Sequence, residues 1–412
     1  MNIMLKTAFV AGVAVLSSGT AYAGCGIEKG SVRVLANDFP ALRQIIDAAS
    51  ACAGDGVTVT RNQTTEHESL DVPSLSANPA EYTSSIVATS SIQPLLGAGL
   101  IRPLDDYIAK YGKNISDKQK ISLGGHVMAI AFDANTQHLF YRADILEKAG
   151  VQPPKSYEDV LAAAKAIKDK GLMQYPLGGT YKAGWNLAEE FVSMYVGYDG
   201  AFFEPGTAKP AINNDKGVAA LNMMKSLSAY MTPDFLTFDS NALQAEFEAG
   251  KVALANFWGS RYGAVVDDKG STPDITKAIK VAAAPTVGGG KIPATTLWWD
   301  GYTIAKNISD ADAIATFQAL DHASSTATAN AHPDDAVWLM DGYKPGAGAG
   351  GVLDTLKAGA KPYPMNPYMG LLHTALGREI VPFMQGKEDA KAALAKAEAA
   401  YVAGAREKGF LK

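Results

Sequence analysis

Short runs of β-branched residues alternate with helix-length amphipathic stretches along this sequence. Within the first such unit, Val32–Ala36 predicts a strand, residues 42–51 have helical periodicity, and Val57–Thr60 predicts a second strand. A strand, a connecting helix and another strand form the unit from which parallel sheets are built. Because the alternation continues throughout the chain, the sequence predicts an α/β fold with parallel-rich sheets.

The stretch "KSYEDVLAAAKAIKDKG" carries the clearest single element. Ser156 and Asp159 stand at capping-box spacing, apolar residues recur on one face, and Gly171 marks the end, so a helix is expected here. Other expected helices lie within 94–108, before Gly150, and at Asn186–Tyr198, Asp215–Tyr230, Ser240–Ala249, Asp310–Ala323, Pro367–Met384 and Glu388–Arg406. Other expected strands lie at 84–91, Val127–Phe132, Leu139–Tyr141, Tyr175–Gly178, Val252–Phe257, Lys280–Ala283 and Leu297–Ile304. The glycine-rich residues 345–351 are typical of a flexible loop or a hinge.

The first 23 residues have the pattern of a cleavable signal peptide. Lys6 precedes an apolar stretch from Ala8 to Leu16, and residues 21–23 read Ala-Tyr-Ala, the small-x-small pattern of a cleavage site. The apolar stretch is too short to span a bilayer, and no later window is long enough. We therefore expect export to the periplasm with a mature chain starting near Gly24; a short anchor that is kept is the alternative.

Cys25 and Cys52 are the two cysteines of the chain. In an oxidising compartment, such a pair is expected to form a disulfide. A lipid anchor on Cys25 is the alternative, since "AGC" is part of a lipobox, although Tyr22 stands where that motif has a leucine-like residue.

Several classes of function lack support in this sequence. The net charge is −5, whereas nucleic acids and anionic membranes require a basic face. No two of the six histidines have the i, i+4 spacing of metal ligands on one helix face, and the sequence holds neither a G-x-S-x-G elbow nor a phosphate-binding loop. No cofactor, metal ion or enzymatic activity is therefore expected.

Aromatic and polar residues instead gather where strands end. Trp258 follows the strand of "KVALANFWGSRYGAV", and Arg261 lies in the first turn of the helix after it. In parallel α/β sheets, ligands bind beyond the carboxyl ends of strands, so both side chains are candidates for ligand contact. Trp185, in "KAGWNLAEEF", repeats the pattern at the start of a helix. Packing in the protein core is the alternative for each tryptophan.

Adjacent tryptophans occur in the strand "TTLWWDGYTIAK". A strand alternates its side chains, so Trp298 shares a face with Asp300, while Trp299 points to the other face among aliphatic neighbours. An indole can stack on the C–H face of a sugar, and a neighbouring carboxylate can accept hydrogen bonds from its hydroxyls. We therefore expect Trp298 and Asp300 to face a polyhydroxylated ligand and Trp299 to pack in a core.

The segment "FYRADILEKAGVQPPKSYEDVLAAAKAI" (140–167) resembles the extracellular solute-binding proteins of ABC sugar importers, a family that includes maltose-binding protein. The family's pattern there is an aromatic residue, Tyr, a basic residue or Asn, Asp, a short helix ending in Ala-Gly, and Pro-x-(Ser/Thr)-aromatic. Further similarity lies in residues 97–108, 243–260 and 386–401, in the family's order. The segments "YKAGWN", "TLWWDGYTIA" and "KPYPMNPY" are most similar to the binding proteins for polyols and monosaccharide-like ligands. Residues 58–82 depart from the family by lacking its aspartate-containing "DV" strand, which leaves the ligand's identity open.

The resemblance implies a two-lobed periplasmic binding protein fold, with the ligand trapped between the lobes and delivered by a monomeric protein to the transmembrane subunits of an ABC permease. The expected division is an N-lobe from 24–132 and 298–350 and a C-lobe from 133–297 and 351–412, with crossings near 132–135, 298–301 and 345–351. The residues that the resemblance places at the ligand are Asn37, Asp38, Ser90 and Ser91 from the N-lobe, Asn135, Trp298 and Asp300 at the crossings, and Trp185, Trp258, Arg261 and Tyr363 from the C-lobe.

Two alternatives to carbohydrate or polyol capture stay open. Stacking aromatics and carboxylates also serve secreted glycoside hydrolases, although Asp300, Glu190 and Asp38 form no recognisable catalytic pair in the sequence. The same fold could instead bind a sugar acid or another anion, with Arg261 as the clamp.

Overall fold

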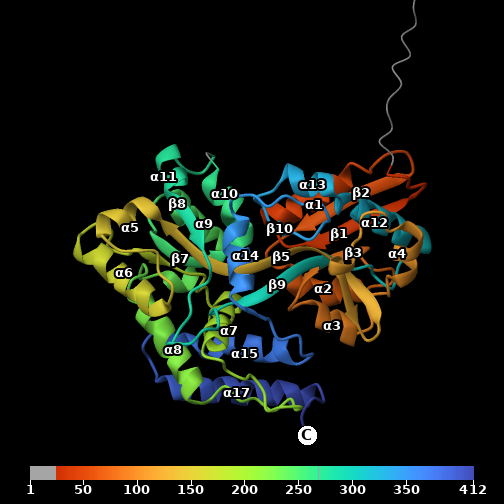
Figure 1. Ribbon diagram of the computed structural model, residues 1–412. Helices are drawn as coiled ribbons and strands as arrows, with labels where there is room; N and C mark the ends of the chain where they lie inside the picture. The colour runs from red at the N-terminus through yellow and green to blue at the C-terminus, as the bar shows by residue number, and fades with distance from the viewer. Residues whose placement is uncertain (1–24, 268) are drawn as a thin grey trace, which may run out of the picture.

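Two α/β lobes joined by long strands make up the computed structural model, which describes residues 25–267 and 269–412 (Figure 1). The signal peptide expected at 1–23 lies outside the described residues. We call the lobe that contains most of the N-terminal strands the N-lobe and the other the C-lobe. No helix in the described part of the chain is long and apolar enough to cross a membrane.

The secondary structure is distributed over the two lobes as follows. The N-lobe holds β1 (Gly30–Ala36), α1 (Pro40–Ser50), β2 (Val57–Gln63), α2 (His67–Ser76), β3 (Ser84–Ala88), α3 (Ile92–Gly97), α4 (Asp105–Tyr111), η1 (Asp117–Gln119), β4 (Lys120–Leu123), α12 (Asp310–Ala323), α13 (Thr326–Ala331) and β10 (Val337–Trp338). The C-lobe holds α5 (Ala143–Ala149), α6 (Tyr157–Asp169), β6 (Leu177–Gly178), α7 (Trp185–Gly197), α8 (Asp215–Ser228), η2 (Phe235–Thr237), α9 (Ser240–Glu248), β7 (Leu254–Trp258), η3 (Gly259–Arg261), α10 (Tyr262–Val266), α11 (Pro273–Ala278), β8 (Ile279–Ala282), α14 (Ala349–Lys357), β11 (Lys361–Pro362), α15 (Met369–Glu379), α16 (Val381–Met384) and α17 (Ala390–Glu407). The strands β5 (His126–Arg142) and β9 (Thr296–Tyr302) belong to both lobes.

One continuous path of paired strands runs through the molecule in the order β2-β1-β3-β9-β5-β7-β6. The outer pairs are parallel: β1 with β2 and with β3, and β6 with β7. The central strands are antiparallel, because β9 runs against both β3 and β5, and β5 runs against β7. The α/β class is confirmed, but the sheets are mixed rather than parallel-rich, since the crossing strands run against their neighbours.

The strand β5 is 17 residues long, where the sequence predicted two short strands with a break between them. The residues of the expected break are polar, and Asp133, Asn135, Thr136 and Gln137 are nevertheless buried. Residues 133–136 pair with β9, so main-chain hydrogen bonds extend the strand through the polar segment. Apolar alternation underestimated this strand because Asn135 and Gln137 donate hydrogen bonds to C-lobe side chains that are distant in the sequence.

The shared strands contribute to separate hydrophobic cores. In the N-lobe core, Phe132 of β5 and Tyr302 of β9 pack with side chains of α1 and α12. In the C-lobe core, Phe140 of β5 and Trp298 of β9 pack with side chains of α7, α8, α15 and α17. Each crossing strand is therefore anchored at both ends, while its middle runs between the lobes.

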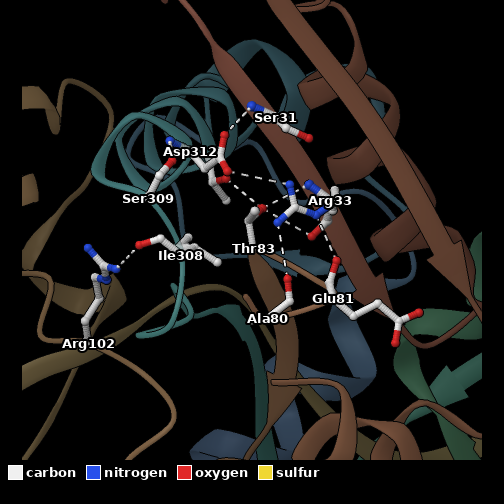
Figure 2. Close-up of polar contacts among 10 residues, drawn as sticks. Ser31, Arg33, Ala80, Glu81, Thr83, Arg102, Ile308, Ser309 and Asp312 are labelled. Carbon is white, nitrogen blue, oxygen red and sulfur yellow. Dashed lines mark hydrogen bonds and ion pairs between the residues drawn. The ribbon is translucent and has the colours of Figure 1, made fainter. Parts of the chain in front are cut away.

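The helix α12 is tied to the N-lobe sheet by a set of polar contacts (Figure 2). Asp312 accepts a 2.7 Å hydrogen bond from the main-chain N–H of Ser31 and lies 3.7 Å from Arg33 in an ion pair. Arg33 also donates to the carbonyl oxygens of Ala80 and Glu81, which lead into β3. These contacts hold α12 against the amino ends of β1 and β3, opposite the strand ends that face the cavity.

The helices α2, α14, α15 and α16 are among those that differ from the sequence expectation. The helix α2 was not predicted, because Pro73 stands inside it and its apolar periodicity is weak. The expected loop at 345–351 ends early, since α14 begins at Ala349. The single helix expected from Pro367 to Met384 is two helices, because Pro382 has no N–H to continue the hydrogen-bond ladder of α15.

Cys25 and Cys52 form a disulfide, with their Cα atoms 5.3 Å apart. The bond ties the residues before β1 to the end of α1. It occupies the sulfur of Cys25 that a lipid anchor would require.

Candidate functional site

A cavity of about 530 Å³ lies where the crossing strands pass between the lobes. Its walls come from the loop after β1 and from α2 in the N-lobe, from α7, α9, β7 and η3 in the C-lobe, and from β5 and β9. Seven of the residues selected from the sequence line it: Asn37, Asn135, Trp185, Trp258, Arg261, Trp298 and Asp300. The structure therefore brings together side chains that are up to 263 residues apart in the sequence.

Trp298 is the centre of an aromatic cluster in this cavity. Its ring centroid lies 5.6 Å from that of Trp185 and 5.7 Å from that of Trp258, and both pairs meet edge to face. Edge-to-face contacts of this kind each contribute about 0.5–1.5 kcal/mol beyond the burial of area. The three indoles form a rigid apolar wall with little freedom to adjust.

A buried hydrogen-bond chain holds the Trp298 indole. Its Nε1–H donates to Thr296 Oγ1 at 2.8 Å, and Thr296 in turn donates to Glu189 Oε1 at 2.8 Å. Burial raises the pKa of Glu189 to about 8. Glu189 is a buried residue of α7, and it is joined to the indole of Trp298 through Thr296.

Tyr363, expected at the ligand, instead lies behind Trp298 and does not line the cavity. Its ring centroid is 4.5 Å from that of Trp298, and its hydroxyl lies 2.9 Å from His373 Nδ1. His373 Nε2 lies 2.9 Å from the carbonyl oxygen of Trp185, so Nε2 donates and Nδ1 accepts from the tyrosine. Burial lowers the pKa of His373 to about 4, which keeps the ring neutral in this relay.

Three more expected residues lie beside the cavity and do not line it. Asp38 is partly exposed and ion-paired with Arg43 at 2.7 Å. Ser91 turns back on the chain, where its hydroxyl accepts from the N–H of Ala88. Ser90 donates a 2.9 Å hydrogen bond to Glu68, which does line the cavity, so Ser90 can orient a lining residue without lining the cavity itself.

Asp300 lines the cavity beside a second carboxylate, Asp133 of β5. The main-chain N–H of Asp300 donates to Asp133 Oδ1 at 2.9 Å, and Asp133 Oδ2 has no partner within the described part of the chain. Burial raises the pKa of Asp300 to about 7, and burial together with Asp300 raises the pKa of Asp133 well above its ordinary value. The pair therefore retains a proton under conditions in which exposed aspartates have lost theirs.

The structure confirms that the adjacent tryptophans lie on opposite faces of the strand, while contact of Trp298 and Asp300 with a ligand stays a prediction. Trp298 and Asp300 line the cavity, whereas Trp299 packs against a small core of the N-lobe that contains Val87 and Ile92. One strand thus supplies both the cavity wall and the core behind it.

Sequence reasoning missed the wall formed by α2. Glu66, His67 and Glu68 line the cavity at the start of this helix, which follows β2. Burial raises the pKa of Glu68 and lowers the pKa of His67 to about 4. The segment "QTTEHES" could have indicated this wall, because it is a polar run just after a strand. Ligands bind beyond the carboxyl ends of strands, and this rule applies to β2 as it does to β7.

The opposite wall carries the basic groups. Lys182 and Arg261 line the cavity, and Lys182 is ion-paired with Asp239 at 3.1 Å. Asn135 joins this wall to β5, since its amide donates to Ser260 Oγ at 3.0 Å. The cavity can thus hold a small molecule by aromatic stacking and by hydrogen bonds to carboxylate, amide and guanidinium groups.

A family model and several known proteins match this chain. The family model described as "Bacterial extracellular solute-binding protein" matches residues 83–330. A probable ABC transporter-binding protein of Deinococcus radiodurans is 30% identical over 198 residues, which cover 46% of this chain and 45% of that protein. The chain thus aligns with less than half the length of this curated relative.

Two solved structures establish the fold at low sequence identity. A solute-binding protein of an ABC transporter from Agrobacterium radiobacter K84, in complex with ribitol, has a TM-score of 0.79 at 18% identity, covering 90% of this chain and 97% of that one. A solute-binding protein from Agrobacterium vitis S4 with bound D-mannitol has a TM-score of 0.76 at 18% identity, covering 92% of this chain and 99% of that one.

Proposed function

Because the chain belongs to the bacterial extracellular solute-binding proteins, we propose that it is the periplasmic substrate-binding component of an ABC transporter. It captures a carbohydrate or polyol between its lobes and delivers it, as a monomer, to the transmembrane subunits of the permease. Nucleic acid has no part in this role.

The observation that carries the proposal is the cavity that both lobes build. Trp185 and Trp258 come from the C-lobe, Glu68 comes from the N-lobe, and Trp298 and Asp300 lie on a shared strand. Indole faces suit the C–H surface of a sugar or polyol, and carboxylates accept hydrogen bonds from hydroxyl groups. Ribitol and mannitol in the two structural relatives are molecules of this class.

Lobe closure follows from the same placement. A ligand shifts an equilibrium between open and closed lobes only if it contacts both lobes in the closed form. The lining residues meet that condition, and β5 and β9 connect the lobes through their middle residues. We propose the division expected from the sequence, with an N-lobe of 24–132 and 298–350 and a C-lobe of 133–297 and 351–412, adjusted so that β9 is shared and α14, from Ala349, belongs to the C-lobe.

Catalysis is not part of the proposed role. A glycoside hydrolase needs two carboxylates on either side of a scissile bond, separated by about 5 Å or more. Asp300 and Asp133 instead lie against each other on paired strands, with the main-chain N–H of one bound to the carboxylate of the other. Hydrolysis of an aryl glycoside by the protein would support the hydrolase instead, provided that Asp300→Asn abolished the activity.

Isothermal titration calorimetry with a panel of polyols and sugars tests the proposal. We expect saturable one-to-one binding of at least one member, with loss of affinity in Trp298→Ala. If no member of the panel bound while peptides or metal ions did, the proposed ligand class would be wrong.

A further inference from the structure

Arg261 differs from the other buried arginine of the described residues in having no anionic partner. Arg142 and Arg261 are each 7% exposed. Arg142 donates to both carboxylate oxygens of Asp144, each at 2.8 Å. Arg261 forms no ion pair within the described ranges, so its charge is buried without a neutralising group.

The hydrogen bonds of Arg261 leave one edge of the guanidinium free. Nη1 donates to the neutral amide oxygens of Asn241 at 2.7 Å and Gln244 at 3.3 Å. Nε and Nη2 have no partner in the portion of the chain that the structure describes, although the residue lines the cavity. Nε and Nη2 form the edge that binds two oxygens of a carboxylate or phosphate side by side.

The N-terminus of α1 lies close to the guanidinium of Arg261. Phe39, the residue before the helix, has no side-chain cap, and its ring centroid lies 5.8 Å from Arg261 Cζ. The first turn of this 11-residue helix contains no acidic residue, and the carboxylate of Asp38 is engaged by Arg43. The positive end of the α1 dipole therefore adds to the field of Arg261.

Of the acidic groups that line the cavity, Asp300 and Glu68 act on each other, whereas Asp239 acts on Arg261 and is itself ion-paired with Lys182. Asp300 has Asp133 and Glu68 as its charged neighbours. The charges that act on the pKa of Arg261 are instead those of Arg43, Asp239 and Asp38. None of these three residues makes a direct contact with Arg261. Burial lowers the pKa of Arg261 to about 10, which still leaves it a cation at neutral pH.

We propose that the solute is a polyol or sugar that carries an acidic group, either a carboxylate or a phosphate, bound by the free edge of Arg261 and the N-terminus of α1. Its hydroxyl groups then reach Asp300 and Glu68 at the other end of the cavity, and its carbon skeleton lies against the indoles between them. The inference rests on the proposed function and narrows the class of solute.

Calorimetry with matched pairs of neutral and anionic probes tests this assignment on the unmodified protein. The pairs are glycerol and glycerol 3-phosphate, ribitol and ribonate, and glucose and glucuronate. We expect the anionic member of at least one pair to bind about tenfold or more tightly than its neutral partner. Comparing the phosphate pair with the two carboxylate pairs identifies which acidic group the site takes.

Arg261→Gln then locates the anion. Removing one partner of a buried charge pair weakens binding about 30-fold or more, and we expect this loss for the anionic probe with little change for the neutral one. Arg378→Gln is the matched control, because it removes the same charge from an exposed position that does not line the cavity and should preserve the anion preference. Arg261→Lys keeps the charge but loses the paired N–H edge, so it should restore the preference only in part.

The outcomes separate the two proposals. Neutral members that bind as tightly as their anionic partners would overturn the acidic solute. An anion preference that survives in Arg261→Gln would overturn the assignment of the acidic group to Arg261. Both results leave the sugar- or polyol-binding role intact. Failure of every neutral and anionic probe to bind would contradict the proposed function itself.

Discussion

The main-chain N–H of Asp300 donates a 2.9 Å hydrogen bond to the carboxylate of Asp133, which places two buried acids side by side where β5 and β9 cross between the lobes. No basic group contributes to the pKa shift of either acid. A pair of like charges in this position is tolerated because at least one member holds a proton.

This pairing predicts an unusual dependence of stability on pH. Burial raises the folded-state pKa of Asp300 to about 7, above its ordinary value of 3.8. Folding therefore favours the protonated form, so the stabilisation is fully present at low pH and is lost as the pH rises through about 7. Burial also raises the pKa of Glu189 to about 8, so the stabilisation from its protonated form is likewise lost as the pH rises.

We accordingly expect the melting temperature of the ligand-free protein to fall between pH 5 and pH 8.5, and to fall less steeply in Asp300→Asn. Asp159→Asn is the control: hydrogen bonding from Lys155 lowers the pKa of Asp159, so its titration lies below this range. A melting temperature that rose over this interval in the unmodified protein would contradict the buried, protonated pair.

The adjacent tryptophans should respond differently to truncation. Trp298→Ala removes the centre of the aromatic wall, and the loss of a buried aromatic contact should weaken ligand binding by about 1–3 kcal/mol. Trp258→Ala should have an effect of the same size. Trp299→Ala should lower the melting temperature but leave the affinity within about threefold, because Trp299 packs against the small N-lobe core that contains Val87 and Ile92. Equal losses of affinity at 298 and 299 would refute this division.

Tyr363 should affect binding only through the side chains that it supports. Tyr363→Phe retains the ring against Trp298 and removes the hydrogen bond to His373. Losing this bond should cost about 0.5–1.5 kcal/mol of unfolding free energy, measured by chemical denaturation, with a smaller effect on affinity. A large loss of affinity at unchanged stability would show that the hydroxyl contacts the ligand directly, as first expected from the sequence.

The disulfide should be structural. Cys25 and Cys52 are separated by 27 residues, and closing a loop of this length stabilises a fold by about 3–4 kcal/mol in the chain-entropy model. The double variant Cys25→Ser/Cys52→Ser should lose free energy of unfolding of this order in denaturant titrations, while its ligand affinity stays close to that of the unmodified protein. An unchanged midpoint would show that the bond contributes nothing to the stability of the N-lobe.

The fold class could be predicted from the sequence because it depends on periodicity that many residues share. The helix α6, with its Ser156 and Asp159 capping box, and the helix α12 were located almost to the residue. The continuous strand β5 could not be predicted, because Asp133 and Asn135 are strand residues only in the presence of their partners on β9 and η3. Local propensity does not contain those long-range contacts.

The candidate site could be predicted only in part, for a related reason. The rule about strand ends identified Trp258 and Arg261, and the period of two separated Trp298 from Trp299. The carboxylate of Glu68 was missed because α2 contains a proline and has little apolar periodicity. Tyr363 was assigned to the ligand because a sequence pattern cannot distinguish a wall residue from the residue that supports it.

Mass spectrometry of the small molecules that co-purify with the periplasmic protein tests the central claim most directly. We expect a polyhydroxylated molecule in a one-to-one ratio, carrying a carboxylate or phosphate, that is released on denaturation and is absent from Trp298→Ala prepared in parallel. A stoichiometric ligand without hydroxyl groups, such as a peptide, a lipid or a metal ion, would contradict the assignment of this cavity.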